Sequence, residues 1–222
     1  FFHRTPSMNK KFLICGALTL GALNTTATAQ SLYGGVGVLG LYNVGYAHHI
    51  NKSFSIRGQY GGGLDYTRDE TVEGVNARAN LKYSTTGLFA DWRPFDGGFR
   101  VAGGVSFNDV KAQVNALGTG TSTINGKTVN MTGETYNVTV EYPKTTPYLG
   151  IGYGHQPAAK GLGFYVDFGL LFGKFKVRSE TSLVNSGKVT QADVDAQDAK
   201  IRDSVDSLSV LPVVHLGMSY RF

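Results

Sequence analysis

The chain ends in the sequence Val213-Val214-His215-Leu216-Gly217-Met218-Ser219-Tyr220-Arg221-Phe222, whose side chains alternate between two kinds. Large apolar residues occupy every second position up to the terminal one: Val214, Leu216, Met218, Tyr220 and Phe222. Because successive side chains of a strand point to opposite faces, the pattern predicts a strand with one apolar face and one small or polar face.

The same alternation recurs through residues 54–66, 99–108, 148–154 and 165–173. A soluble β-sandwich also alternates, so the contents of the two faces must decide the environment. Here the polar face is rich in Gly, Ala and Ser, whereas the apolar face is large and aromatic. This favours a barrel with a narrow lumen and a lipid-facing exterior, because a closed sheet leaves no backbone edge unpaired in hydrocarbon. The expected interfacial aromatic residues are Tyr46, Phe54, Trp92, Phe99 and Phe222.

Connection lengths predict the orientation of the barrel. Short connections are expected at residues 48–52, 94–98 and 156–161, and long ones at 67–74, 114–135 and 179–207. Outer-membrane barrels have short periplasmic turns and longer extracellular loops. The Asn125-Gly126 pair predicts a tight hairpin inside the second long loop. Thr190 and Asp193 resemble a capping box, and predict a short, acidic, amphipathic helix at about residues 191–207 in the third.

The pattern predicts an odd number of strands. Seven strands are clear, near residues 32–47, 53–66, 76–92, 99–113, 138–154, 163–178 and 208–222. Two periplasmic termini require an even number. Either residues 33–40 hide a first short strand and a tight loop, or one long loop has been misread. We predict an all-β fold: an antiparallel transmembrane β-barrel of about eight strands, with long extracellular loops and one short loop helix.

The first 29 residues are typical of a targeting segment rather than of the fold. They contain a basic start at Lys10 and Lys11, an apolar stretch and a small-residue cleavage site at residues 27–29. We expect Met8 to be the initiator, residues 1–29 to be removed, and residues 30–222 to form the barrel. Their removal would lower the net charge from +5 to +2 and take away Cys15, the only cysteine. A lipoprotein anchored through Cys15 is a second interpretation, although Ile14 stands where such signals have a small residue.

Several stretches resemble a known family. The terminal strand resembles the signal that the outer-membrane barrel assembly machinery reads. Residues 87–100, 147–154 and 163–177, and the acidic helix with residues 211–214, resemble small proteobacterial barrels that include the carbapenem-associated outer-membrane protein, an ornithine-uptake porin. Residues 45–54 are similar to the first periplasmic turn of outer membrane protein A, which joins strands two and three. The resemblance implies a multi-pass protein of the Gram-negative outer membrane, with porin-like transport as a further expectation.

Eleven polar residues are expected to face the lumen: Arg57, Gln59, Asp65, Arg78, Asn80, Lys82, Asp91, Arg100, Asp167, His215 and Arg221. Charges in so narrow a space must be paired. One interpretation is a conduit for small polar solutes such as amino acids. The other is a plug in a closed structural or surface-binding barrel, because eight strands enclose a space that side chains nearly fill.

A lipid-modifying enzyme is the remote alternative. His215 and Ser219 share a face but stand about 13 Å apart along the strand, too far for a serine hydrolase pair. We therefore predict no catalytic residues, no metal site, no cofactor and no nucleic-acid partner. The expected partners are outer-membrane lipid and lipopolysaccharide, the barrel assembly machinery and a small polar solute.

Overall fold

The computed structural model describes residues 30–72, 75–95, 97–155, 160–206 and 209–222. The predicted targeting segment and most of the predicted turn at 156–161 lie outside the described residues. The described strands and helix are β1 (Gln30–Gly37), β2 (Tyr42–His49), β3 (Phe54–Val72), β4 (Val75–Trp92), β5 (Phe99–Gly118), β6 (Thr121–Ile124), β7 (Lys127–Asn130), β8 (Thr135–Glu141), β9 (Thr145–Gly154), β10 (Gly161–Phe172), β11 (Lys176–Thr181), α1 (Gln191–Asp206) and β12 (Val210–Arg221).

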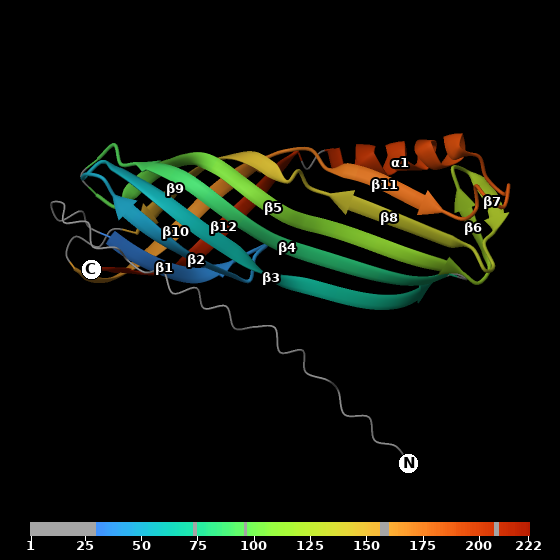
Figure 1. Cartoon of the computed structure of the whole chain (residues 1–222), viewed down its shortest axis with the longest axis horizontal. Helices are drawn as coiled ribbons and strands as arrows, with labels where there is room; N and C mark the ends of the chain where they lie inside the picture. Colours follow the sequence, from blue (N-terminus) through green and yellow to red (C-terminus); the bar gives the residue numbers. More distant parts are fainter. Residues whose placement is uncertain (1–29, 73–74, 96, 156–159, 207–208) are drawn as a thin grey trace, which may run out of the picture.

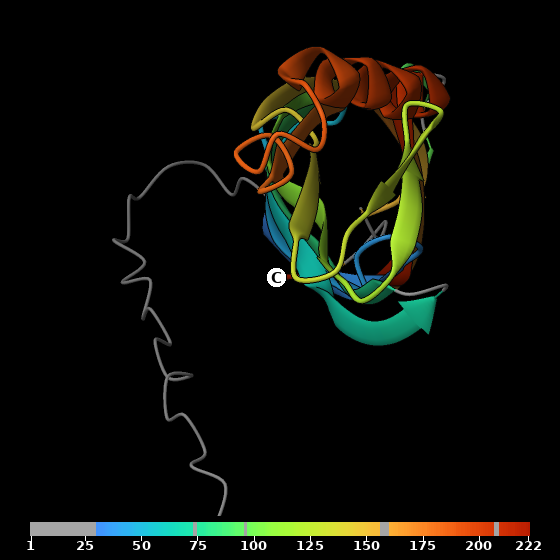
Figure 2. The same cartoon turned by 90° about the vertical axis from the view of Figure 1, so that its right-hand side faces the viewer.

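The strands form a closed antiparallel barrel (Figures 1 and 2). Consecutive strands pair from β1 to β5, and β12 pairs with β1 to close the ring. Both β8 and β9 pair with β5, and β11 pairs with β8 while β10 pairs with β9. Thus β8 and β9 together form one long strand with a short break at residues 142–144, and β10 and β11 form another with a break at 173–175. The barrel has eight strands in this sense, which confirms the predicted fold class.

The missing strand lies in the glycine-rich stretch near the start of the described chain. The stretch predicted as one strand, residues 32–47, contains two strands, β1 and β2, joined by a loop at 38–41. The two strands pair from Gln30 opposite His48 to Gly35 opposite Asn43. The first of the two explanations for the odd count is thus confirmed, and the turn after β2 joins strands two and three.

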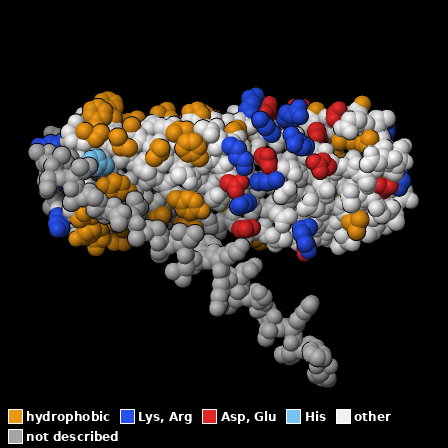
Figure 3. Space-filling view, in the orientation of Figure 1, with side chains coloured by type: hydrophobic (Ala, Val, Ile, Leu, Met, Phe, Trp, Pro, Cys, Tyr) orange, Lys and Arg blue, Asp and Glu red, His pale blue; other side chains and the backbone are white. Residues whose placement is uncertain are grey.

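The outer surface of the barrel carries a broad apolar band. Its side chains are large and exposed, and come from every side of the barrel: Leu32, Val36, Val44, Ile56, Leu88, Phe107, Leu149, Ile151, Phe164, Phe168, Leu216 and Met218. On the face seen in Figure 3, hydrophobic side chains gather over one half of the molecule, beside a half rich in charged side chains. Such a surface is stable only against hydrocarbon. The protein is accordingly a multi-pass barrel of the outer membrane, as the sequence pattern predicts.

Several strands extend well past this band. β3, β4 and β5 contain 19, 18 and 20 residues, although about 10 residues span a bilayer in a tilted strand. Their far ends, with β6, β7, β8, β11 and α1, form a module at the opposite end from the C-terminus (Figure 1), which we call the extracellular module after its predicted orientation. Among the described residues, no helix is long and apolar enough to cross a membrane.

The extracellular module has its own small core, and it contains the hairpin and the capping box that the sequence predicts. Ile124, Met131, Tyr136, Leu183 and Val194 are buried together. Asn125 and Gly126 both have positive φ (48° and 80°), as the predicted hairpin requires. The backbone N–H of Asp193 donates to Thr190 Oγ1 (3.2 Å), and Thr190 N–H donates to Asp193 Oδ2 (3.1 Å). This capping box begins helix α1 at the predicted residue.

Candidate functional site

Four buried charged side chains cross-link the lumen near its periplasmic end. Arg57 from β3 and Arg100 from β5 each contact both Asp91 from β4 and Asp167 from β10. The Arg57–Asp91, Arg57–Asp167 and Arg100–Asp91 distances are 3.1, 3.3 and 2.8 Å, and Arg100 Nη2 also contacts Asp167 Oδ1. All four side chains are at most 2% exposed. We call them the charge layer; its net charge is zero.

Neighbouring groups hold this layer in place. Arg57 Nη1 also donates to Gln59 Oε1 (2.9 Å), and its guanidinium lies 4.8 Å from the centre of the Phe89 ring. The ring of His155, at the end of β9, places Nε2 3.0 Å from Asp167 Oδ2 and stacks on Tyr165 at 3.9 Å. A buried ion pair is stable only when its remaining polar atoms also have hydrogen-bond partners. The contacts above provide such partners for most of these atoms.

A second layer of side chains fills the lumen on the extracellular side of the charges. Its members are buried and mostly bulky, and we call them the apolar layer: Phe89, Ala102, Tyr142, Tyr148, Leu171 and Val213. The rings of Phe89 and Tyr148 lie 4.3 Å apart, and Tyr142 donates its hydroxyl to the carbonyl of Leu171 (2.8 Å). An eight-stranded barrel is narrow enough for such side chains to fill it.

The structure brings together most of the residues predicted to face the lumen. Besides the charge layer, Gln59 lies beside His215, with Gln59 Nε2 3.5 Å from His215 Nδ1. Arg221 shares the inward face of β12 with His215 and with Ser219, which is buried. Seven of the eleven residues thus lie on the inner face.

The remaining four, Asp65, Arg78, Asn80 and Lys82, lie on the outer face, and the prediction for them is wrong. β4 pairs with β5 without a register shift, so residues 78, 80 and 82 share the face of Leu88 and Trp92, opposite Asp91. In β3 a bulge between Gly61 and Leu64 reverses the alternation, and Asp65 pairs with Lys82 outside the barrel. Arg78 and Lys82 instead form exposed ion pairs with Asp69 (2.6 Å) and Asp109 (2.7 Å).

His155 and the bulky members of the apolar layer are not among the residues that the sequence predicts to face the lumen. Tyr148 does stand on the small face of its strand in the sequence pattern, and this signal could have identified it. His155 follows β9 in a turn with φ of 65°, where alternation gives no information.

The buried hydroxyl–imidazole pair in the lumen lacks the third member of a catalytic triad. Ser31 Oγ lies 3.1 Å from His49 Nε2, but His49 Nδ1 has no hydrogen-bond partner among the described residues. A serine nucleophile needs a base that is itself oriented by a third group. Within the same ranges, no three His, Cys, Asp or Glu side chains are grouped to hold a metal ion.

The fold is similar to that of two solved proteins from Acinetobacter baumannii. CarO2 has a TM-score of 0.57 and 21% identity, covering 90% of this chain and 100% of its own. CarO has a TM-score of 0.56 and 20% identity, covering 88% of this chain and 98% of its own. No protein-family model and no curated protein sequence matches the chain. The likeness concerns the fold, and it agrees with the resemblance noted in the sequence.

Proposed function

We propose that the protein is an outer-membrane barrel with a closed lumen, which anchors its extracellular module at the cell surface. The observation that carries this proposal is the burial of the charge layer, whose four side chains are at most 2% exposed. They come from β3, β4, β5 and β10, so they tie together strands on different sides of the ring. A hydrated pore would leave these charges in contact with water.

The apolar layer supports the same proposal independently. Its only polar side-chain groups are the hydroxyls of Tyr142 and Tyr148, and the Tyr142 hydroxyl already donates to the carbonyl of Leu171. Two hydroxyls cannot replace the hydration shell of an ion or amino acid. Transport of a small polar solute is the competing function. It would require the charge layer to open, with the solute taking the place of one ionic partner.

Electrical recording of the refolded residues 30–222 in planar bilayers tests the proposal. We expect no unit conductance from the wild-type protein, and no uptake of lysine or glutamine into proteoliposomes. The double variant Phe89→Ala/Tyr148→Ala, which removes two aromatic rings from the apolar layer, should admit small ions intermittently. Its matched control, Phe164→Ala/Phe168→Ala, removes two aromatic rings from the lipid-facing surface and should stay silent. Steady wild-type conductance, or amino-acid uptake that changes in Arg57→Gln, would contradict a closed lumen.

A further inference from the structure

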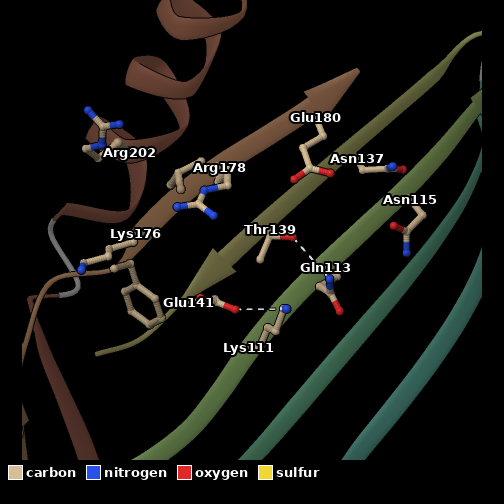
Figure 4. A pocket seen from close by; sticks show the side chains of 12 residues that line it. Lys111, Gln113, Asn115, Asn137, Thr139, Glu141, Lys176, Arg178, Glu180 and Arg202 are labelled. Carbon is tan, nitrogen blue, oxygen red and sulfur yellow. Dashed lines mark hydrogen bonds and ion pairs between the residues drawn. The ribbon is translucent and has the colours of Figure 1, made fainter. Parts of the chain in front are cut away.

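A polar cavity of about 620 Å³ lies on the outer face of the extracellular module, where β5, β8 and β11 run side by side (Figure 4). Strand pairing arranges its walls in three rows. Lys176, Glu141 and Lys111 form one row, Arg178, Thr139 and Gln113 the next, and Glu180, Asn137 and Asn115 the third. Directly opposite side chains in a sheet have Cβ atoms about 5 Å apart, so the nine groups form a compact polar grid.

The charges around this cavity are not balanced by the protein. Four cations line it, Lys111, Lys176, Arg178 and Arg202, against the two carboxylates Glu141 and Glu180. Lys111 is paired with Glu141 at 3.0 Å. Lys176, Arg178 and Arg202 form no ion pair with any residue that the structure describes, although other surface cations such as Lys82 and Arg78 do. The cavity therefore has a net charge of +2 and three cations available to a ligand.

The cavity lies close to the lipid. On β5 the continuous apolar row of the outer face runs to Phe107, and Lys111 follows four residues later on the same face. Phe172 and Lys176 repeat this spacing across the break between β10 and β11. Four strand residues span about 13 Å, which places the cations at the level of the headgroups rather than far from the membrane.

We propose that this cavity binds a phosphorylated sugar of the lipopolysaccharide that surrounds the barrel in the outer leaflet. The guanidinium groups of Arg178 and Arg202 can donate paired hydrogen bonds to phosphate oxygens, and Lys176 adds a point charge. Gln113, Asn115, Asn137 and Thr139 supply the amide and hydroxyl groups that pair with sugar hydroxyls. The site requires the module to face the cell exterior, but it is independent of whether the lumen conducts.

Native mass spectrometry of the refolded residues 30–222 tests the site, with a deep-rough lipopolysaccharide of lipid A and two inner-core sugars as the probe. We expect one tightly retained copy on the wild type. Lys176→Gln/Arg178→Gln should weaken its retention about tenfold or more, since it removes two charge-assisted contacts. The matched control Arg68→Gln/Lys144→Gln removes two positive charges from exposed ion pairs outside the cavity and should retain the lipid as the wild type does.

The heat-modifiable gel shift of each variant verifies that the barrel has folded before binding is compared. If both double variants lose lipopolysaccharide retention equally, only the overall surface charge matters, and the proposal is overturned. Unchanged binding in Lys176→Gln/Arg178→Gln would overturn it as well. Glucose 1-phosphate that binds the wild type as tightly as the lipopolysaccharide would identify a soluble sugar phosphate as the ligand, against the outer-leaflet assignment.

Discussion

At the scale of single residues, Asp167 is the carboxylate of the charge layer with the most buried ionisable partners, so losing its charge should destabilise the protein most. It contacts Arg57, Arg100 and His155, and all three are buried. Asp167→Asn preserves the shape of the side chain but removes its charge, leaving two guanidinium groups with one carboxylate between them. We expect the free energy of unfolding, measured by urea titration in lipid vesicles, to fall by about 3 to 5 kcal/mol.

The control for this change is Asp69→Asn, which breaks an exposed ion pair with Arg78 in the extracellular module. Solvent screens such pairs, so its unfolding curve should stay close to that of the wild type. Similar curves for the two variants would mean that the lumen is wet and that Asp167 is not part of a closed layer.

Gly152 lies beside the charge layer, where there is no room for a larger side chain. A Cβ added at Gly152 would overlap Asp167 Oδ1 and lie 2.9 Å from Arg100 Nη2. Gly152→Ala must therefore displace the ion pairs, and overpacking of this kind costs about 1 to 3 kcal/mol of unfolding free energy. At Gly103, on the same sheet, a Cβ would meet nothing within 4 Å, so Gly103→Ala is the matched control. Equal stabilities of the two variants in the same urea titration would contradict the packing described.

At the scale of the element, strand β12 closes the barrel by pairing with both β1 and β10. Its outer residues Leu216, Met218 and Tyr220 are exposed in one lipid-facing row, as the alternating sequence predicts, and Phe222, directly after the strand, is exposed as well. Deleting Phe222 should lower the amount of heat-modifiable barrel in the outer-membrane fraction, because the assembly machinery loses the end of its signal. Phe222→Tyr keeps an aromatic terminus and should assemble normally.

In vitro refolding separates recognition from stability in that experiment. The protein that lacks Phe222 should refold in vesicles as the wild type does, since the side chain packs mainly against lipid. Normal accumulation in cells without Phe222 would show that the terminal residue is not read.

The strands also show where sequence reasoning stops. Alternation identified the lipid-facing rows and the inward positions of Arg57, Asp91, Arg100 and Asp167, because a period of two fixes a face once one residue is assigned. It failed at Asp65 because the bulge between Gly61 and Leu64 shifts the alternation, and the bulged stretch consists of glycines, which carry no apolar or polar pattern to reveal the shift. Arg57 on β3 meets Asp167 on β10 only because the barrel closes. The pattern of either strand alone cannot predict that contact.

The extracellular module is held by carboxylates whose ionisation can be tested. Glu134 accepts hydrogen bonds from Ser182 and Lys188, the latter at 2.9 Å, which lowers its pKa from 4.5 to about 2. Asp193 contacts Lys127 at 2.8 Å and Thr190 Oγ1 at 2.7 Å, and its pKa is also lowered. A lowered pKa means that the folded module favours the ionised form. This contribution to stability is present above pH 4.5 and is lost as the pH falls towards 2.

Hydrogen–deuterium exchange, expressed as protection factors, should therefore show the segments around Glu134 and Asp193 losing protection between about pH 4.5 and 2. The strands in the apolar band should keep their protection over the same range. In Glu134→Gln/Asp193→Asn the module should be less protected at neutral pH and its protection should change less on acidification. A module equally protected at both pH values in the wild type would show that these carboxylates do not hold it.

At the scale of the whole molecule, the apolar band divides the protein into three zones that thiol chemistry can distinguish. Cys15 is the only cysteine of the chain and lies in the segment expected to be removed, so introduced cysteines can be labelled without background. A membrane-impermeant maleimide added to intact cells should label Thr128→Cys, which is exposed on β7 of the extracellular module. Lys52→Cys, in the turn after β2, should react only after the outer membrane is permeabilised. Leu88→Cys, in the apolar band, should react in neither case because lipid covers it. Labelling of Lys52→Cys but not Thr128→Cys on intact cells would invert the barrel, and would place the cationic cavity in the periplasm, away from the outer-leaflet sugars.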